Sequence, residues 1–177
     1  MSVTRLLTIE DAPALASLAR ANREFLAPWD PRHREEYFTA GGQRAVVRNA
    51  LAGHRQGSGL PHGILDETGR LVGRITLSGI VRGPFQSCSM GYWVAADHNG
   101  RGLATAAVRE MIGVTFGELG LHRIQAETLP HNTASQRVLE RNGFVRFGLA
   151  PGYLAIAGRW QDHILYQLLN SGLAAPS

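Results

Sequence analysis

The stretch MGYWVAADHNGRGLAT, residues Met90–Thr105, decides the fold that we expect for this chain. Its apolar run Tyr92–Ala95 predicts a strand, and the polar residues Ala96–Asn99 predict a turn after it. A glycine-containing loop follows, and apolar residues then recur at the spacing of one helix face. The positions that carry this face are Leu103, Ala107, Met111 and Val114. The stretch therefore predicts a strand, a loop of small residues and a helix N-terminus, in that order.

A loop of this kind predicts a phosphate-binding site. The first N–H groups of a helix have no partner within the helix, and the helix dipole places positive charge at the same point. Gly100 and Gly102 would let an anion approach the backbone closely. The chain contains no lysine, which excludes a P-loop, and Thr105 stands where the dinucleotide-binding fingerprint has its third glycine.

The residues of this loop resemble the acyl-coenzyme A loop of the GNAT acetyltransferases, written [QR]-x-x-G-x-[GA]. Here the motif reads Asn99-Gly100-Arg101-Gly102-Leu103-Ala104. Gly102 and Ala104 fit, whereas Asn99 stands in place of Gln or Arg. The backbone cradle does not depend on that side chain. On this loop alone, an ordinary turn between a strand and a helix remains an equal alternative.

A second motif indicates the family. Residues 132–144, NTASQRVLERNGF, are similar to the N-x-x-S-x-x-V-L-E-[KR]-x-G-F signature of the RimJ/RimL-type N-acetyltransferases. Residues 158–162, GRWQD, resemble the closing G-x-W-x-D segment of that family. The two motifs and the ending extend the resemblance from about Thr8 to Leu169. The resemblance does not select ribosomal alanine acetylation over the other acceptors of the family.

The resemblance implies the GNAT fold, an α/β (α+β) architecture with a mixed central sheet flanked by helices. The apolar periodicity predicts the matching order β-α-α-β-β-β-α-β-α-β-β, with about seven strands and about four helices. Strands are expected at Val3–Leu7, Pro61–Asp66, Leu71–Ile80, Ser87–Ala95, His122–Leu129, Phe144–Leu149 and Trp160–Leu169, and helices from Thr8 to about Ala21 and at Gln43–Arg55, Ala104–Glu118 and Asn132–Asn142. We expect one domain over residues 1–170 and a loose tail at 171–177.

Composition excludes several classes of protein. The chain has 177 residues, of which 44% are hydrophobic and 18% charged, as in a globular domain. It has no apolar run long enough to span a membrane, and its first residues carry acids where a signal peptide would be apolar, so we do not expect secretion. Its one cysteine, Cys88, cannot form an internal disulfide, which fits the expectation of a cytoplasmic protein. The net charge of +4 suits a polyanionic cofactor. The arginines are scattered, which ranks nucleic acid lower, and no spacing indicates a metal.

The resemblance assigns the cofactor, acetyl-CoA, to two elements. The N–H groups of Gly100–Thr105, including those of Arg101, Leu103 and Ala104, would surround the pyrophosphate. The edge of Tyr92-Trp93-Val94 would pair with the pantetheine amides, and a backbone N–H near Val94 would polarise the thioester carbonyl. In the family Asn132 contacts the cofactor arm; a plain helix N-cap is its alternative role, compatible with the first.

Catalysis would fall to two further residues. Glu127 matches the position of the catalytic glutamate in the related RimI-type enzymes and is the first choice as base; a surface carboxylate paired with an arginine is the alternative. Ser135 is the candidate proton donor to the leaving thiolate, or only a hydrogen-bond partner of its sulfur. RimI-type enzymes place a tyrosine further along this helix, where the chain has Leu139. Weaker candidates are His131, Tyr153, Asp162 and His163.

The sequence says least about the acceptor, the amine that receives the acetyl group. The segment Phe25–Pro31 holds two prolines and large apolar residues, so we expect a loop in which Phe25, Leu26 and Trp29 form one wall of the acceptor pocket. A protein or peptide N-terminus is our first choice, because an α-amine needs less help from a base than lysine does. A small amine, such as an antibiotic, polyamine or amino acid, and a non-catalytic coenzyme A-binding protein are the alternatives. The last strands could pair across a two-fold axis in a homodimer, which the residues do not require.

Overall fold

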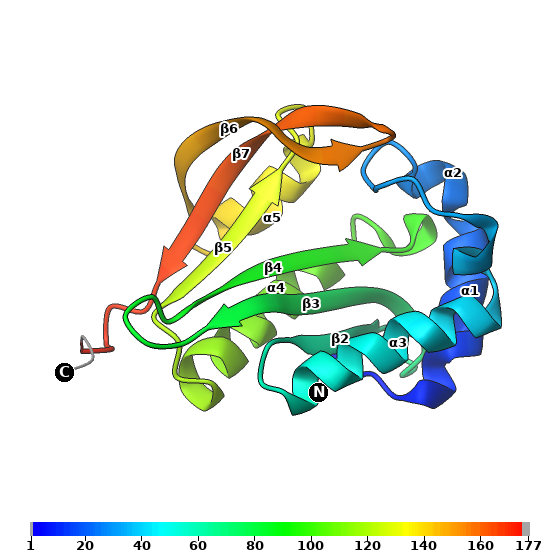
Figure 1. Cartoon of the computed structure of the whole chain (residues 1–177), viewed down its shortest axis with the longest axis horizontal. Helices are drawn as coiled ribbons and strands as arrows, with labels where there is room; N and C mark the ends of the chain where they lie inside the picture. The colour runs from blue at the N-terminus through cyan, green and yellow to red at the C-terminus, as the bar shows by residue number, and fades with distance from the viewer. Residues whose placement is uncertain (1, 175–177) are drawn as a thin grey trace.

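The computed structural model describes residues 2–174, and one seven-stranded mixed sheet runs through it in the order β1-β2-β3-β4-β5-β7-β6 (Figure 1). Neighbouring strands are antiparallel except β4 and β5, which are parallel. The strands are β1 Thr4–Leu6, β2 Leu60–Leu65, β3 Leu71–Val81, β4 Ser87–Val94, β5 Arg123–Thr128, β6 Val145–Ile156 and β7 Arg159–Leu169. The predicted fold class and strand order are therefore confirmed.

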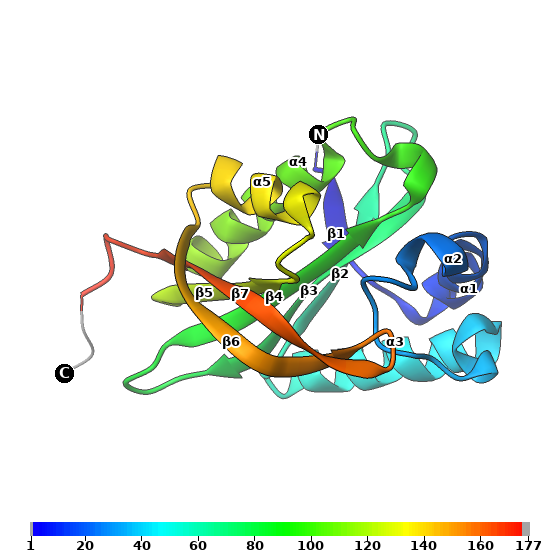
Figure 2. The ribbon, with the colours of Figure 1, turned by 90° about the horizontal axis from the view of Figure 1, so that it is seen from above.

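Helices cover both faces of the sheet (Figure 2). α4 and α5 lie on one face, and α1 and α3 lie on the other with α2 beside them. The helices are α1 Ala12–Ala21, α2 Arg23–Leu26, α3 Ala40–Arg55, α4 Leu103–Gly113 and α5 Thr133–Arg141. Among residues 2–174, no helix has both the length and the apolar character that crossing a bilayer requires.

Two clusters of buried side chains hold these layers together. The larger lies between the sheet and helices α4 and α5, where Ile75, Leu77, Met90, Met111 and Ile124 are almost fully buried. A smaller cluster of Leu7, Leu15 and Val47 joins α1 and α3 to the other face. Burying a side chain of this size contributes about 1.5–3 kcal/mol, so the apolar periodicity of the helices explains where they pack.

Two segments differ from the prediction. The segment at Phe25 is not wholly irregular: Arg23–Leu26 forms one helical turn that ends before Pro28. Strand β6 does not end at Leu149 but continues to Ile156, across a register shift between Ala150 and Leu154. Pro151 lies inside this irregularity, where no residue pairs with β7, so its missing N–H interrupts no regular ladder. The division into a domain at 1–170 and a tail remains a prediction, and residues 175–177 of that tail lie outside the described part.

The sheet opens between its two parallel strands. β4 and β5 pair only from Ser87 with Arg123 to Ser89 with Gln125, and then diverge (Figure 1). β5 stays paired with β7 along its whole length, and β4 stays paired with β3. The second half of β4 therefore has one edge, facing β5, that is free of ladder bonds. This opening positions the candidate site.

Candidate active site

A groove of about 430 Å³ lies at the opening between β4 and β5. Its walls come from β3, β4, β5, α5, the β6–β7 hairpin and the loop after α2. A second cavity of about 280 Å³ adjoins it under α1 and α2. The two share six lining residues: Leu26, Asp30, Pro31, His33, Tyr37 and Trp93.

The loop before α4 has the backbone that the glycines predicted. Gly100 and Gly102 adopt φ values of +76° and +78°, the left-handed region that glycine reaches without strain. Gly102 is the N-cap of α4, and the N–H of Ala106 makes the first bond back to its carbonyl at 2.9 Å. The N–H groups of residues 103–105 therefore precede the helical ladder and are available to an anion.

Asn99 has a structural role at the start of this loop. Its side-chain amide donates to the carbonyl of Val94 at 3.3 Å and to that of Ala95 at 3.1 Å. This side chain therefore ties the loop to the end of β4, which accounts for an Asn at a motif position usually held by Gln or Arg. Arg101 is exposed beside the loop.

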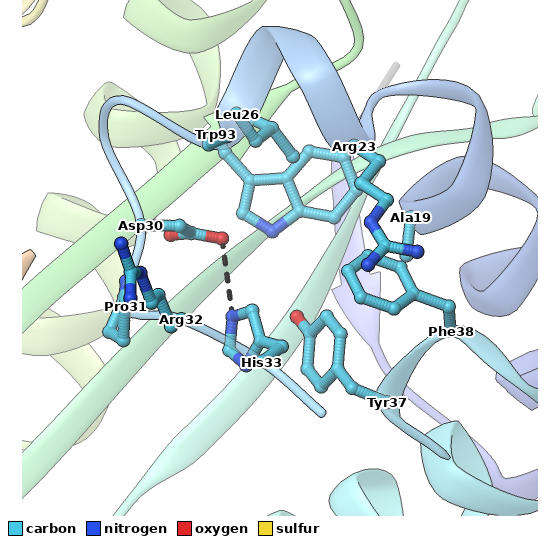
Figure 3. Close-up of a pocket in the computed structure, with 11 residues that line it drawn as sticks. Ala19, Arg23, Leu26, Asp30, Pro31, Arg32, His33, Tyr37, Phe38 and Trp93 are labelled. Carbon is cyan, nitrogen blue, oxygen red and sulfur yellow. Dashed lines mark ion pairs between the residues drawn. The ribbon is translucent and has the colours of Figure 1, made fainter. Parts of the chain in front are cut away.

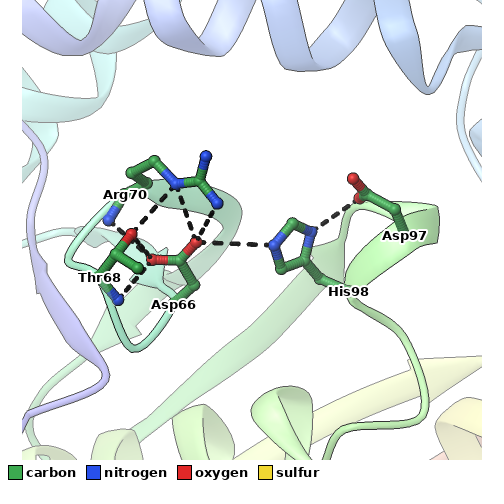
Figure 4. A network of polar contacts seen from close by, with 5 residues as sticks. All are labelled: Asp66, Thr68, Arg70, Asp97 and His98. Atoms are coloured by element: carbon green, nitrogen blue, oxygen red, sulfur yellow. Dashed lines mark hydrogen bonds and ion pairs between the residues drawn. The ribbon is translucent and has the colours of Figure 1, made fainter.

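A polar network fixes the turn that leads into the loop (Figure 4). In the β2–β3 turn, Asp66 accepts hydrogen bonds from the backbone N–H groups of Thr68 and Arg70 at 2.9 and 3.0 Å. These bonds and the Thr68 hydroxyl hold the pKa of Asp66 far below its usual range. His98 lies 3.6 Å from Asp66 and 2.7 Å from Asp97. The hairpin turn thus anchors the segment Ala96–His98.

The free edge of β4 exposes the groups that a cofactor arm could use. The N–H of Ala95 donates to the carbonyl of Val72 at 2.8 Å, and this register directs alternate residues toward β3. In an antiparallel pair the residues between them direct their N–H and C=O groups away. The N–H groups of Tyr92 and Val94 therefore point into the opening. An extended ligand could pair with this edge as an added strand.

Side chains of β4 and β5 divide the groove into two faces. On the face covered by α5, the hydroxyl of Tyr92 lies 2.9 Å from the hydroxyl of Ser135 and donates to its carbonyl at 3.2 Å. Burial raises the pKa of Tyr92 to about 12, so it stays protonated. The side chain of Asn132 accepts from the N–H of Ser135 at 3.2 Å, the N-cap role predicted as its alternative. Leu139 also lines this face.

Glu127 lies on the opposite face of the sheet. It alternates along β5 with the buried Ala126 and Thr128, and the hydroxyl of Ser89 donates to it at 3.4 Å. Burial raises the pKa of Glu127. Among the described residues Glu127 forms no ion pair with an arginine, so that alternative role has no support. Its carboxylate could accept a proton at the opening.

The loop after α2 closes one end of the groove. Leu26 and Trp29 line the groove, and the rings of Trp29 and His131 lie 5.3 Å apart. Phe25, predicted as part of this wall, lines neither cavity and is 43% exposed, because its position on the single turn of α2 faces outward. The carbonyl of Asp30 accepts from the N–H of Ala157 at 2.9 Å, which joins this loop to the tip of the β6–β7 hairpin.

Polar residues that sequence reasoning missed lie where the two cavities meet (Figure 3). Asp30 lies 3.5 Å from His33, and the ring of His33 stacks on Tyr37 at 3.6 Å. Burial raises the pKa of Asp30. Arg74 of β3 also lines the groove. The alternation of Arg74, Thr76 and Ser78 in an otherwise apolar strand was the one signal that could have indicated this wall.

Of the weaker candidates for a catalytic role, some line the groove and others support the strands around it. His163 is buried and lines the groove, and its ring lies 5.8 Å from that of Tyr153. Asp162 accepts from the N–H of Gly152 at 2.8 Å, so it supports the β6–β7 hairpin. Burial raises the pKa of Cys88 to about 12, which is unsuitable for a nucleophile. Among residues 2–174 no three potential ligands gather as a metal site.

A family model, the acetyltransferase (GNAT) domain, matches residues 3–145, and the chain belongs to this family. It is an acetyl-CoA-dependent N-acetyltransferase of the RimJ/RimL type, as the resemblance predicted. The [Ribosomal protein uS5]-alanine N-acetyltransferase of Escherichia coli is 36% identical over 94% of this chain and 86% of its own. The probable N-acetyltransferase YjcK of Bacillus subtilis is 35% identical over 94% and 92%.

Solved structures agree with these relatives. Ribosomal-protein-S5-alanine acetyltransferase from Vibrio fischeri superposes with a TM-score of 0.92 at 32% identity, over 97% of this chain and 94% of that one. Mycobacterium smegmatis RimJ, in complex with CoA-disulfide, gives 0.91 at 32% identity, over 96% and 82%. The free edge of β4 and the glycine loop are the elements here that fit such a cofactor.

Proposed function

We propose that this enzyme acetylates the α-amine at the N-terminus of a protein or peptide. The observation that carries the proposal is the division of the groove, with a carboxylate on one face of the split sheet and a pair of hydroxyls on the other. A reaction that removes a proton from an amine and delivers one to a thiolate needs two such groups, on either side of the reacting carbon. The acceptor follows from the relatives named for uS5-alanine acetylation.

The cofactor would lie along β4 and the glycine loop. Acetyl-CoA supplies the acetyl group as a thioester. The N–H groups of residues 100–105 would hold its pyrophosphate, with Arg101 beside them, and the free edge of β4 would pair with its pantetheine amides. The N–H of Val94 would donate to the thioester oxygen, and one such donor contributes about 10²–10³ to the rate of acyl transfer.

Glu127 would act as the base. A C–N bond forms as the C–S bond breaks, and Glu127 takes the proton of the attacking amine, directly or through water. The burial that raises its pKa brings the carboxyl nearer to the amine in basicity, and the hydroxyl of Ser89 orients it. An α-amine with a pKa of about 7.7–8.0 is already partly neutral at pH 7, which suits a carboxylate base.

Ser135 would serve the departing thiolate, and Tyr92 supports it. A serine hydroxyl is a weak acid. The one hydroxyl hydrogen of Tyr92 lies within reach of both the carbonyl and the hydroxyl of Ser135, at 3.2 and 2.9 Å. Turned to the hydroxyl, it would leave Ser135 free to direct its own hydrogen toward the sulfur. The pair thereby occupies the role that a tyrosine at the position of Leu139 has in RimI-type enzymes.

A small amine is the second candidate acceptor. The contact between Asp30 and Ala157 closes the groove on one side, which favours a narrow acceptor. The extended N-terminus of a peptide satisfies the same limit, since it is one chain wide. We infer a cytoplasmic site of action, because the acceptors named for the relatives are ribosomal proteins.

A homodimer through the last strands, which the residues allow but do not require, would use β6, the free edge of the sheet. Val145 and Leu149 are exposed on this strand and could pack against a second copy. Sedimentation equilibrium tests this arrangement, and a monomer at all concentrations would contradict it.

The deciding experiment measures thiol release from acetyl-CoA. Peptides that begin with Ala, Ser or Met are compared with a panel of small amines. We expect turnover on peptides, and a loss of about 10²–10⁴ in kcat for Glu127→Gln. Glu67→Gln is the matched control, because Glu67 is exposed in the β2–β3 turn, and it should retain wild-type rates.

Each alternative has its own outcome in this assay. Turnover on small amines alone would replace the peptide acceptor with the second candidate. Tight binding of coenzyme A without turnover on any amine would leave a coenzyme A-binding protein. Equal rates for Glu127→Gln and the wild type would remove Glu127 as the base.

A further inference from the structure

A row of polar side chains lies on the β3 wall of the groove. Arg74, Thr76 and Ser78 alternate along the strand, so all three side chains are on the same face. Across the sheet they pair with Trp93, Gly91 and Ser89 of β4. Ser89 is the residue whose hydroxyl contacts Glu127, so this is the face of the proposed base.

Arg74 is the charged member of this row, and few acceptors of the protein bind its guanidinium. Its Nε donates to the hydroxyl of Thr76 at 3.2 Å, and this is the one hydrogen bond of the guanidinium within residues 2–174. No carboxylate of that part lies within 4.0 Å of it. Burial lowers the pKa of Arg74, although the nearby Asp30 and Tyr37 act in the opposite direction.

Arg74 therefore lines the groove, and its terminal nitrogens have no protein acceptor within residues 2–174. A half-buried guanidinium in this state is stabilised by any ligand that brings an oxygen acceptor to it. Asp30 does not supply that oxygen, because its carboxylate is directed to His33 at 3.5 Å (Figure 3). In the open groove water can supply this oxygen, and a bound acceptor that displaces the water must supply an oxygen of its own.

The register of the strands sets the distance from Arg74 to the reacting amine. Extending the pairing of Ser89 with Gln125 places Glu127 level with Gly91, which pairs with Thr76. Arg74 lies two residues further, roughly 7 Å along the sheet, and two strands away, which is more than roughly 10 Å across it because β4 and β5 diverge beyond Ser89 and Gln125. The guanidinium and the carboxylate both reach inward from these positions. A chain whose amine is at Glu127 thus brings its first carbonyl groups to Arg74.

We propose that Arg74 is a specificity-determining residue that donates hydrogen bonds to a carbonyl oxygen in the first two peptide units of the acceptor. This inference rests on the proposed function, since it assumes an amine at Glu127. It gives the enzyme a way to distinguish peptides from alkylamines, which carry no such oxygen.

The test compares two acceptors in two variants. Ala-Ala-Ala-amide presents the carbonyl groups, and propylamine presents only the amine. The variant Arg74→Met keeps the length of the side chain and removes its hydrogen-bond donors. We expect it to lower kcat/KM for the tripeptide about 10- to 100-fold, the change in rate that corresponds to the loss of one hydrogen bond to a charged group. The rate with propylamine and the KM for acetyl-CoA should not change. Arg44→Met, at an exposed position of α3, is the matched control.

Other results would overturn the inference. An equal loss with both acceptors would show a structural role, and no loss with either would show that Arg74 does not contact the acceptor. A wild type that prefers propylamine would also contradict it.

A binding measurement separates this inference from the proposed function. The tripeptide is titrated into the coenzyme A-loaded protein by calorimetry, which needs no turnover. If the wild type binds the peptide and Arg74→Met does not, the inference stands even where no acetyl transfer is detected. If the wild type does not bind the peptide, the inference fails.

Discussion

At the scale of single residues, the contact between Tyr92 and Ser135 lends itself to a direct test. Tyr92→Phe removes one hydroxyl and keeps the ring that fills the buried site. We expect kcat to fall about 10-fold, the value of one hydrogen bond of roughly 1–1.5 kcal/mol, with no change in the KM for acetyl-CoA. Steady-state kinetics measures both constants.

Tyr166→Phe is the control for this change. The hydroxyl of Tyr166 is also hydrogen-bonded, to Glu140 at 3.2 Å, but outside the groove. A similar loss of kcat in both variants would show that the effect comes from packing rather than from the hydrogen bond between Tyr92 and Ser135.

The burial of Glu127 predicts how both stability and activity change with pH. Burial raises the pKa of Glu127, so the folded protein favours the neutral carboxyl over the carboxylate. The neutral carboxyl therefore contributes to the stability of the folded protein at low pH, and this contribution is lost as the pH rises through the folded-state pKa. Activity needs the carboxylate, so its acidic limb should lie above the range of an ordinary glutamate.

The variant Glu127→Gln separates these two effects. We expect it to remove the acidic limb of the kcat/KM profile and to raise the melting temperature slightly at pH 7. A variant that is inactive and also less stable would contradict this account.

At the scale of elements, the glycine loop can be separated into backbone strain and ligand binding. Gly102 has φ +78° and Gly57, after α3, has φ +72°, and a Cβ would meet no atom at either position. Alanine should therefore cost both sites about 1–2 kcal/mol through the left-handed backbone alone. Chemical denaturation measures this loss.

Of the two variants, only Gly102→Ala should weaken the binding of acetyl-CoA. Its φ directs the N–H groups at the start of α4, so the KM for acetyl-CoA should rise, while Gly57→Ala should leave it unchanged. Equal KM values in the two variants would show that the loop does not bind the pyrophosphate.

At the scale of the whole molecule, the acceptor groove is assembled from segments far apart in the chain. The loop after α2 meets the β6–β7 hairpin at Asp30 and Ala157, and Trp29 meets His131 before α5. We expect Trp29→Ala to raise the KM for the peptide acceptor about 10-fold, as for the loss of a buried aromatic contact at a binding surface, without changing that for acetyl-CoA.

Trp160→Ala is the matched control for this prediction, because Trp160 lies on the β6–β7 hairpin that the loop of Trp29 contacts, but it is 72% exposed and does not line the groove. If both tryptophan variants raise the acceptor KM equally, the hairpin as a whole is responsible rather than the wall formed by Trp29.

The local parts of this enzyme could be predicted from the sequence because they depend on neighbouring residues. The apolar periodicity located α4, the capping residues Asn132 and Gly143 located α5, and the glycines located the positive φ values of the loop. The motif from Asn132 to Phe144 indicated the family. Glycine preference and helix periodicity are properties of the local backbone, so a single chain segment reveals them.

Only the tertiary structure decided which side chains face the groove. The extension of β6 past Pro151 depends on the place of that strand at the edge of the sheet, and the hydroxyl contact of Tyr92 with Ser135 joins residues 43 positions apart. Arg74 and Asp30 line the same groove because the fold brings β3 and the loop after α2 together. Burial and pairing across the sheet are long-range properties, and no local pattern of residues determines them.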